Sequence, residues 1–435
     1  MFSNCSALEF IGEQLAWNMS SPGWCCSPVG FVSLYIMCNS KGNVESIALP
    51  NMALHGNVSF LEKLDSILKV DLEGNNFFGT MPSLNIDVEM VNICTNLLVG
   101  SLPSFSKYSK LAEINLSENS FVGSFPLWNS NISQINLSEN RLTGSIPSLA
   151  GYPRLTGLAL RTNRFTGTIP SFSENKELKI LSLELNLLTG TVPSFSTNQH
   201  LFGLYLALNQ LGGTIPTFSQ NYNLLELSLW SNQLSGVIPS FSSNTVLQQL
   251  ALYENNLSGE IPSFYNNADL SYLALRYNQL SGTIPSFSNN GYLQELYLYS
   301  NSLSGSIPTF SSNTKLSVLS LASNQLHGSV PSFLGNTALA KLDLHSNNLT
   351  GEVPEFDSLK NLDRLDLSAN RLKLDDVSFP KIPFVNLSNN AFSGSCEVFD
   401  IPELALVDIS GNSFVCPYPK LRREQTVIRD QVAFS

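Results

Sequence analysis

Charged residues are scarce in this chain. Only 13% of its 435 residues are Asp, Glu, Lys or Arg, about half of the roughly 25% that is usual in soluble proteins. The 23 Lys and Arg against 34 Asp and Glu leave a net charge of -11. A chain with so few cations cannot neutralise a run of phosphates, so we expect no nucleic-acid partner. With 43% apolar residues the chain is not disordered in composition. It also lacks an 18-residue apolar run, so we expect no membrane insertion.

Sequence motifs of catalysis and cofactor binding are missing as well. The chain has no G-x-S-x-G, H-E-x-x-H, Walker or dinucleotide-binding motif, and no C-x-x-C pair of the kind that holds structural zinc. Its four histidines, His55, His200, His327 and His345, are scattered. We therefore predict a protein that is not an enzyme and that holds no cofactor or metal.

The chain does contain a long internal repeat. From Leu155 to Asn370 the pattern L-x-x-L-x-L-x-x-N-x-L-x-G-x-I-P-S-F-S returns every 23 residues. With shorter steps it extends upstream to Val44 and downstream to Asn412, which gives 17 copies. Length alone would suggest about three domains, but stacked repeats bury their faces on one another and fold as one solenoid.

Each part of the repeat has a physical role. L-x-L forms a short strand with its leucines inward, so one strand per copy builds a long parallel sheet. The Asn side chain bonds the backbone of neighbouring coils, Gly permits a positive φ and Pro fixes an extended corner. Ten phenylalanines share the position after I-P-S or its equivalent, and we interpret them as a buried column on the convex side. They are Phe105, Phe172, Phe195, Phe218, Phe241, Phe264, Phe287, Phe310, Phe333 and Phe356.

The G-x-I-P part resembles the plant-type leucine-rich repeats of receptor-like proteins, receptor-kinase ectodomains and polygalacturonase inhibitors, over residues 44–416. The resemblance implies a second short strand on the flank of the solenoid. Repeats of 23 residues in place of 24, with Phe in place of a helical Leu, favour a tight convex turn over a helix. The prediction is a leucine-rich-repeat solenoid of about 17 repeats, with a long parallel sheet on the concave side and little regular helix outside the N-terminal cap. We divide the chain into a disulfide cap (1–43), the repeat array (44–416) and a polar tail (417–435).

Six of the seven cysteines lie near the two ends of the array. The segment around Trp24-Cys25-Cys26 resembles the N-terminal cap of the same family, which implies the disulfides Cys5–Cys25 and Cys26–Cys38. We expect Cys396–Cys416 to staple the C-terminal end. Cys94 is left over, and we interpret it as a lone surface thiol.

Paired cysteines predict an oxidising compartment. Nine N-x-S/T sequons agree with this, and Asn256 and Asn348 are the most accessible candidates for glycosylation. We expect an extracellular or cell-surface location. No signal peptide is visible at the start M-F-S-N-C, so we expect a processed or truncated secreted chain.

The concave face is the most informative surface. The third, fifth and seventh residues of L-x-x-L-x-L-x-x-N alternate outward and form columns along the sheet. Aromatic and charged residues gather in these columns between residues 205 and 299. We predict that they bind a ligand, because exposed aromatic patches and Trp, Tyr and Arg mark interaction sites; the alternative is that Tyr merely suits strands. The predicted site comprises Tyr205, Glu226, Trp230, Tyr253, Tyr272, Arg276, Tyr297 and Tyr299.

The function we predict is recognition of a protein or peptide ligand on the concave face, with a membrane-anchored co-receptor as a further candidate partner. An oligosaccharide is the alternative ligand, because rings also stack on sugars. A second hypothesis is binding of ice or a polysaccharide through exposed hydroxyls on the flank, such as Thr168, Thr191 and Thr214. A third, inhibition of a secreted wall-degrading enzyme, rests on the resemblance alone.

One histidine offers an alternative to pure recognition. His345 stands beside Asp343, and Asp366 is expected one strand away. This trio suits a metal or acid–base site, but L-D-L is also ordinary strand sequence in these repeats, and we favour that interpretation.

Overall fold

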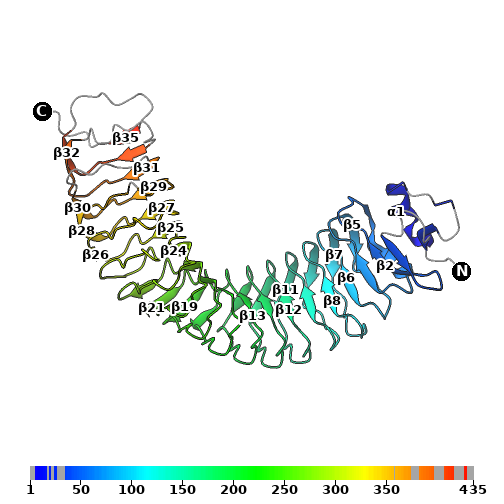
Figure 1. Ribbon diagram of the computed structural model, residues 1–435. Coiled ribbons are helices and arrows are strands. Elements are labelled where there is room, and N and C mark those ends of the chain that lie inside the picture. The colour runs from blue at the N-terminus through cyan, green and yellow to red at the C-terminus, as the bar shows by residue number, and fades with distance from the viewer. Residues whose placement is uncertain are drawn as a thin grey trace. The chain divides into compact units, whose positions relative to one another are not determined.

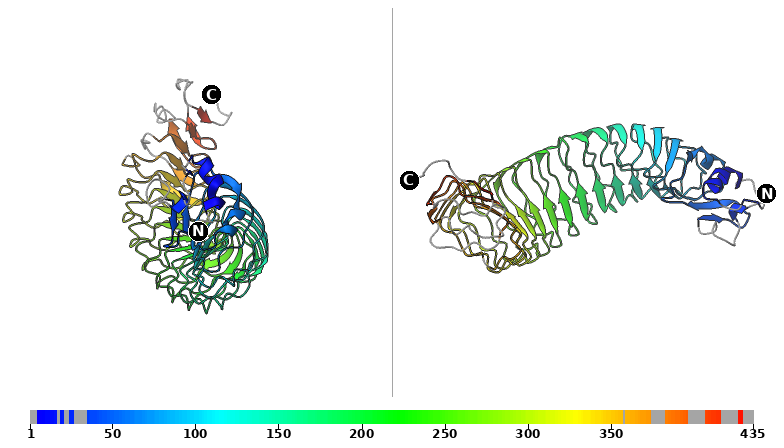
Figure 2. Two further views of the ribbon diagram at one scale, coloured as in Figure 1. Left: turned by 90° about the vertical axis from the view of Figure 1, so that its right-hand side faces the viewer. Right: turned by 90° about the horizontal axis from the view of Figure 1, so that it is seen from above.

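The structure is a computed structural model. It describes residues 5–16, 19–20, 24–26, 35–356, 358–373, 382–395, 406–415 and 426–428. The chain forms two compact units, Met1–Leu211 and Gly212–Ser435. Each unit is a stack of short coils that contribute parallel strands (Figure 1). Figure 2 shows from two further directions that neighbouring coils within a unit lie side by side. The predicted leucine-rich-repeat solenoid of about 17 turns is confirmed.

The main sheet of the first unit takes one strand from each coil, because each x-L-x strand buries its central apolar residue and turns its two outer residues to the concave face. In β12 and β14, for example, Leu158 pairs with Leu181, and both are buried. Strand β1 (Ile36–Cys38) joins as an antiparallel edge. The parallel strands are β2 (Val44–Ala48), β4 (Lys69–Asp71), β6 (Met90–Asn92), β8 (Glu113–Asn115), β10 (Gln134–Asn136), β12 (Gly157–Ala159), β14 (Ile180–Ser182) and β16 (Gly203–Tyr205).

The main sheet of the second unit is built in the same way. Its last strand, β35, falls in the segment predicted as a tail and pairs in parallel with β33. The strands are β18 (Glu226–Ser228), β20 (Gln249–Ala251), β22 (Tyr272–Ala274), β24 (Glu295–Tyr297), β25 (Val318–Ser320), β27 (Lys341–Asp343), β29 (Arg364–Asp366), β31 (Phe384–Asn386), β33 (Leu406–Asp408) and β35 (Thr426–Ile428).

Second short strands run along the flank, as the resemblance implies. Glycines of the G-x-I-P segment have positive φ, and a Cβ on Gly190 (φ 79°) would lie 2.7 Å from Cγ2 of Thr168 in the coil before. In the first unit the strands are β3 (His55–Asn57), β5 (Asn76–Thr80), β7 (Leu97–Ser101), β9 (Ser120–Gly123), β11 (Arg141–Ser145), β13 (Arg164–Thr168) and β15 (Leu187–Thr189). In the second they are β17 (Gly212–Thr214), β19 (Gln233–Gly236), β21 (Asn256–Glu260), β23 (Gln279–Ser281), β26 (His327–Gly328), β28 (Asn348–Glu352), β30 (Arg371–Lys373), β32 (Ser393–Ser395) and β34 (Ser413–Val415).

Helix is confined to the N-terminal part of the described chain, as predicted. The elements are η1 (Cys5–Leu8), α1 (Glu9–Gln14), η2 (Trp24–Cys26) and η4 (Val58–Lys63), and only α1 is an α-helix. The side chain of Gln14 covers the edge strand β3: its Nε2 donates to the His55 carbonyl (2.7 Å), and its Oε1 accepts from the His55 N–H (2.9 Å). The cap thereby satisfies backbone groups that an open edge would leave exposed.

The Asn of the repeat joins two neighbouring coils. Asn186, for instance, accepts the N–H of Phe165 (2.9 Å) and donates to the carbonyls of Leu160 (3.0 Å) and Leu183 (3.1 Å). Its side chain is therefore the partner that the buried turns need.

A second asparagine ladder lies on the convex side, three residues after eight of the ten Phe of the buried column, and sequence reasoning missed it. Asn267 donates to the carbonyls of Phe241 (3.0 Å) and Asn244 (2.7 Å). These fully buried side chains belong to Asn175, Asn198, Asn221, Asn244, Asn267, Asn290, Asn313 and Asn336. The predicted phenylalanine column packs beside them; neighbouring rings such as Phe241 and Phe264 are stacked with centroids 6.4 Å apart.

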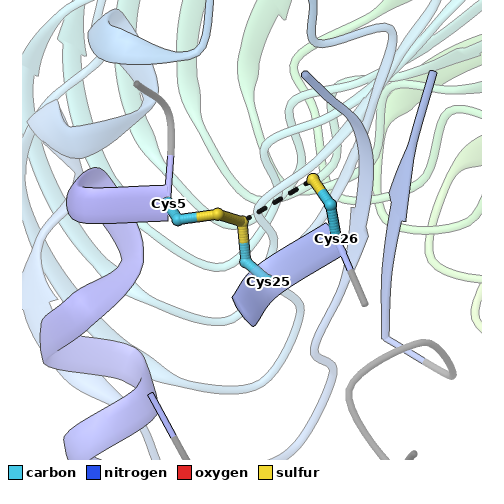
Figure 3. A group of neighbouring side chains, drawn as sticks. All are labelled: Cys5, Cys25 and Cys26. Atoms are coloured by element: carbon cyan, nitrogen blue, oxygen red, sulfur yellow. Dashed lines mark hydrogen bonds between the residues drawn. A yellow bond between two sulfur atoms is a disulfide. The ribbon is translucent and has the colours of Figure 1, made fainter. Parts of the chain in front are cut away.

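The N-terminal cap holds two disulfides. Cys5 is bonded to Cys25 and Cys26 to Cys38, the pairings that the resemblance implies. Figure 3 shows the first of these beside Cys26, whose sulfur lies 3.8 Å from that of Cys25. These sulfurs are bonded in pairs, so their proximity does not make a thiolate metal site. The predicted Cys396–Cys416 staple lies outside the described residues.

The interpretation of Cys94 as a surface thiol is wrong. Its position on the strand faces outward, but only 6% of it is exposed. Burial raises the pKa of the thiol, and the Glu73 carboxylate adds to the rise. Cys94 is therefore held as a neutral, unreactive thiol.

Replacing a convex asparagine should destabilise the protein strongly. Asn267→Ala removes one of the two donors of each of two carbonyls, which keep only the N–H groups of Asn244 and Leu247, so we expect a loss of roughly 1–3 kcal/mol in urea unfolding. The matched control is Asn266→Ala, next to it in sequence but exposed, with one bond to the Ser242 carbonyl. Equal stability of the two variants would contradict a structural role for the second ladder.

Candidate functional site

Six side chains gather on the concave face of the second unit, over β18 to β24. We call Trp230, Tyr253, Tyr272, Arg276, Tyr297 and Tyr299 the aromatic cluster. The strand register places Tyr272 opposite Glu295 and Ala274 opposite Tyr297. Side chains at corresponding positions of successive coils therefore come within contact of one another.

The cluster is built around a layered stack. The rings of Trp230 and Tyr253 are nearly parallel (10°), with centroids 4.8 Å apart. The guanidinium carbon of Arg276 lies 3.6 Å from the Tyr253 centroid. The chain order Trp230, Tyr253, Arg276 in successive coils places Tyr253 between its two neighbours. Arg276 also approaches Tyr297 (5.3 Å) and Tyr299 (5.8 Å), so it meets three aromatic rings.

Two further tyrosine pairs extend the cluster. Tyr297 donates a hydrogen bond to Oε2 of Glu295 (2.9 Å), and its ring lies 5.9 Å from that of Tyr272. Burial raises the pKa of Tyr297, and the bond to the anionic Glu295 raises it further. Tyr277 meets Tyr299 edge-on at 5.1 Å and is 50% exposed, which makes it the outer edge of the cluster. Tyr277 was not among the predicted site residues, although its position next to Arg276 is visible in the sequence.

Arg276 is a half-buried cation without a carboxylate partner. The ion pairs among the described residues are Lys110–Asp87, Arg161–Glu139 and His345–Asp343, and none involves Arg276. Burial opposes its charge, yet its pKa is raised overall because a hydrogen bond with Tyr272 and the nearby tyrosine oxygens favour the cation. Burial also raises the pKa of Tyr253 and Tyr299, although the positive charge of Arg276 opposes this. The site therefore holds a charged guanidinium among neutral phenols.

The strands place the other two predicted binding residues as well. Glu226 is half-buried on β18, opposite Gln249. Tyr205 belongs to the first unit, and its ring covers Gly203 of its own strand, where a Cβ would lie 2.8 Å from the ring. The structure thus brings together six of the eight predicted residues.

The concave face of the first unit is different in character. A depression of about 320 Å³ lies there, and the residues that line it include Asn92, Asn115 and Asn136. Asn92 donates to Asp71 (3.1 Å) and Glu73 (3.0 Å). Burial raises the pKa of Asp71; a backbone hydrogen bond at Glu73 opposes this, and the Glu73 carboxylate adds to it.

Neutralising Asp71 should stabilise the protein at neutral pH. Because its pKa is higher in the folded chain than in the unfolded chain, folding takes up protons, and stability falls as pH rises above the ordinary Asp range. Asp71→Asn should therefore raise the unfolding free energy at pH 7, by on the order of a few tenths of a kcal/mol at this partly exposed site.

The gain from Asp71→Asn should disappear near pH 3, where the carboxyl is protonated in both states. Thermal unfolding at the two pH values measures this. The control is Asp87→Asn, which loses an exposed 3.1 Å ion pair with Lys110 and should give no gain. If Asp71→Asn lowered the stability at pH 7, the proposal that the buried Asp71 carboxylate costs stability there would be refuted.

The histidine trio also comes together, on β27 and β29 of the second unit. Nδ1 of His345 lies 2.6 Å from Oδ1 of Asp343. One ligand atom from each of Asp343, His345 and Asp366 lies within 4.8 Å of the others. The hydrogen bond to Asp343 raises the pKa of His345; burial and Arg364 oppose the rise, while the charges of both aspartates add to it.

The remaining predicted surface features are accessible. Asn256 and Asn348, the candidates for glycosylation, are exposed at the starts of β21 and β28. The flank hydroxyl row is exposed too, but Val237 (63% exposed) and Glu260 interrupt it. The row comprises Ser145, Thr168, Thr191, Thr214, Thr283, Ser306 and Ser329.

The coils, ladders and flank strands define a leucine-rich-repeat protein. The family model described as Leucine Rich Repeat matches residues 292–313 and 315–337. No curated protein matches the sequence. Among the described residues, no helix combines the length and apolar character needed to cross a membrane.

Solved structures with this fold include plant receptor ectodomains, which confirms the predicted resemblance. A TDR receptor is 27% identical with a TM-score of 0.72, over 86% of this chain and 75% of that one. The plant peptide hormone receptor RGFR1, in complex with RGF2, is 27% identical with a TM-score of 0.67, over 85% and 71%. The Arabidopsis receptor kinase HAESA ectodomain, in complex with an N-terminally extended IDA peptide hormone, is 23% identical with a TM-score of 0.58, over 95% and 94%. This last likeness concerns the fold alone.

Proposed function

We propose that this chain is a non-enzymatic extracellular recognition module that binds a peptide or protein ligand through the aromatic cluster. The observation that carries the proposal is the half-buried Arg276, stacked on Tyr253 and without a carboxylate partner among the described residues. The likeness to a peptide hormone receptor in complex with RGF2 supports it.

The cluster has the properties of a binding hot spot. Trp, Tyr and Arg are the residues most enriched where binding energy concentrates. Here they are already held in place by mutual stacking, so ligand binding would cost little additional side-chain entropy. Small residues beneath them, such as the fully buried Ala274, leave room for close packing.

The geometry also indicates what the ligand should present. Arg276 has planar N–H donors that suit a carboxylate or a backbone carbonyl oxygen. No described carboxylate lies within ion-pair distance of Arg276. An acidic side chain of the ligand would supply this missing partner. Apolar ligand side chains would pack beside Trp230 and the rim formed by Tyr277 and Tyr299.

A peptide fits the cluster better than the alternative, an oligosaccharide. Sugars stack on open ring faces, whereas Trp230 lies against Tyr253 and Arg276 lies 3.6 Å from the centre of the same ring. The cluster presents ring edges and a guanidinium, which suit the mixed polar and apolar surface of a peptide.

An extracellular location agrees with the two disulfides of the cap, which persist in oxidising compartments. The similarity to plant receptor ectodomains supports the same location. We include a membrane-anchored co-receptor as a partner on this ground alone.

Removing the stacked pair should abolish ligand binding. Displayed random peptides are selected on the full chain, and the binders are measured against Trp230→Ala/Tyr253→Ala. We expect losses of at least about 2 kcal/mol, or roughly thirtyfold in affinity, as at other aromatic hot spots.

The matched control for this experiment is Tyr265→Ala. Tyr265 is 61% exposed and has no ring contact with the cluster. Binders that lose no affinity on the double variant would remove the cluster as the binding site, provided circular dichroism shows both variants folded.

The guanidinium of Arg276 should contribute to ligand affinity through its shape and donors as well as through its charge. Arg276→Lys keeps the positive charge but loses the flat face on Tyr253 and the forked donors. For binders that contain an acidic residue we expect a roughly tenfold loss, measured by surface plasmon resonance. The same change should have little effect on binders without an acid, and equal losses in both groups would contradict a role for Arg276 in reading a ligand acid.

A further inference from the structure

A recurring side-chain cap follows many strands of the main sheets. In five copies the fifth residue of the repeat is Asp or Asn, and its Oδ1 accepts the N–H, and in four of them also the hydroxyl, of a Ser two residues later. In β29, Asp366 Oδ1 accepts from the Ser368 N–H (3.1 Å) and hydroxyl (2.6 Å). The same pairs are Asn115–Ser117, Asn136–Ser138 (through the N–H alone), Asn386–Ser388 and Asp408–Ser410.

Strand β27 departs from this pattern by one residue. His345 stands where these five copies have Ser. Two further copies also lack this Ser: Asp71 accepts the N–H of Glu73, and Asn92 accepts the N–H of Cys94.

Asp343 Oδ1 accepts the His345 N–H (3.3 Å) and lies 2.6 Å from the ring nitrogen Nδ1. When Nε2 carries the proton, the lone pair of Nδ1 and the carboxylate of Asp343 face the same point, where a metal ion can take the place of the proton that otherwise lies between them. The cap itself needs no imidazole, because Ser forms it in other copies. The ring of His345 therefore adds a nitrogen ligand that the cap does not use.

A second carboxylate faces this pair from the next strand. Asp343 is directly opposite Asp366 in the parallel register of β27 and β29, an arrangement of like charges that is unfavourable by itself. Asp366 is only 8% exposed and forms no ion pair among the described residues. The side chains of His345 and Asp343 are 37% and 30% exposed, so the group is reachable from solvent.

We propose that Asp343, His345 and Asp366 bind a divalent metal ion of the zinc class. One nitrogen and two carboxylate oxygens are a ligand set that Zn²⁺ accepts with water in the fourth place. The three ligand atoms already lie within 4.8 Å of one another, and a dication balances two carboxylates beside a neutral imidazole. Ca²⁺ and Mg²⁺ prefer six or more oxygens, which this group does not offer.

One positive charge that acts on this group is that of Arg364, at the start of β29. Its guanidinium carbon lies 4.5 Å from the centroid of the Phe384 ring. Ser320, on the other side, donates weakly to the second oxygen of Asp343 (3.4 Å). The proposal is independent of peptide binding, because it uses none of the residues of the aromatic cluster.

The chain itself supplies matched variants for the test. His345→Ser and Asp366→Asn each recreate a residue that other copies carry at the same position, so the cap and the fold should be preserved. Zinc binding to the full chain, purified without a histidine tag, is measured by isothermal titration calorimetry. We expect one saturable site per chain, a loss of at least about tenfold in affinity for either variant, and no loss for His327→Gln on the flank strand β26.

Two further measurements complete the test. A hundredfold excess of Ca²⁺ should leave Zn²⁺ bound, and Arg364→Gln should tighten binding because it removes a nearby positive charge. The proposal is overturned if the wild-type chain shows no saturable zinc binding, if His345→Ser binds zinc as tightly as wild type, or if Ca²⁺ displaces the zinc. Circular dichroism of each variant establishes that it is folded.

Discussion

Buried asparagine side chains that bond the backbone of neighbouring coils hold this structure together. A coil of 23 residues with two corners leaves many N–H and C=O groups inside, where water cannot reach them. Asn186 satisfies three such groups on the strand side, and Asn267 satisfies two on the convex side. Because both ladders recur with the same step, each coil is locked in register with the next. The phenylalanine column can then stack without a helix beside it.

Because the ladders and the phenylalanine column hold the coils together, the residues of the concave face are free to vary. The third, fifth and seventh residues of each repeat contribute little to the core, so they can differ from coil to coil without changing the fold. In the first unit they include several carboxamides and acids, among them Asn92 and Glu113. In the second they include the stacked Trp230, Tyr253 and Arg276. The same scaffold therefore carries two chemically distinct surfaces.

Much of this was predictable from the sequence, because a repeated pattern states the same structural rule many times. The strand of each coil, the first ladder and the phenylalanine column follow directly from residue spacing. The second ladder was equally visible as an Asn three residues after eight of the ten Phe, but an isolated Asn in a polar stretch suggests a solvated turn. Cys94 shows another limit: alternation predicts which way a side chain points, not how deeply its neighbours cover it. Likewise, spacing placed Arg276 near several tyrosines, but its position on Tyr253 depends on side-chain rotamers, which spacing does not encode.

Two sites of opposite charge lie on one face of the second unit. Arg276 attracts an anion, whereas Asp343 and Asp366 attract a cation. Three coils separate Arg276 from His345, which at about 4.8 Å per strand is roughly 14 Å. The Debye length at physiological ionic strength is about 8 Å, so charges at this distance on a solvated face are largely screened from one another. Two coils lie between them: the first carries the carboxylate of Glu295 on β24, and the second carries only Val318 and Ser320 on β25. An anion at Arg276 and a cation at the aspartates would therefore bind nearly independently, and the two sites can be altered separately.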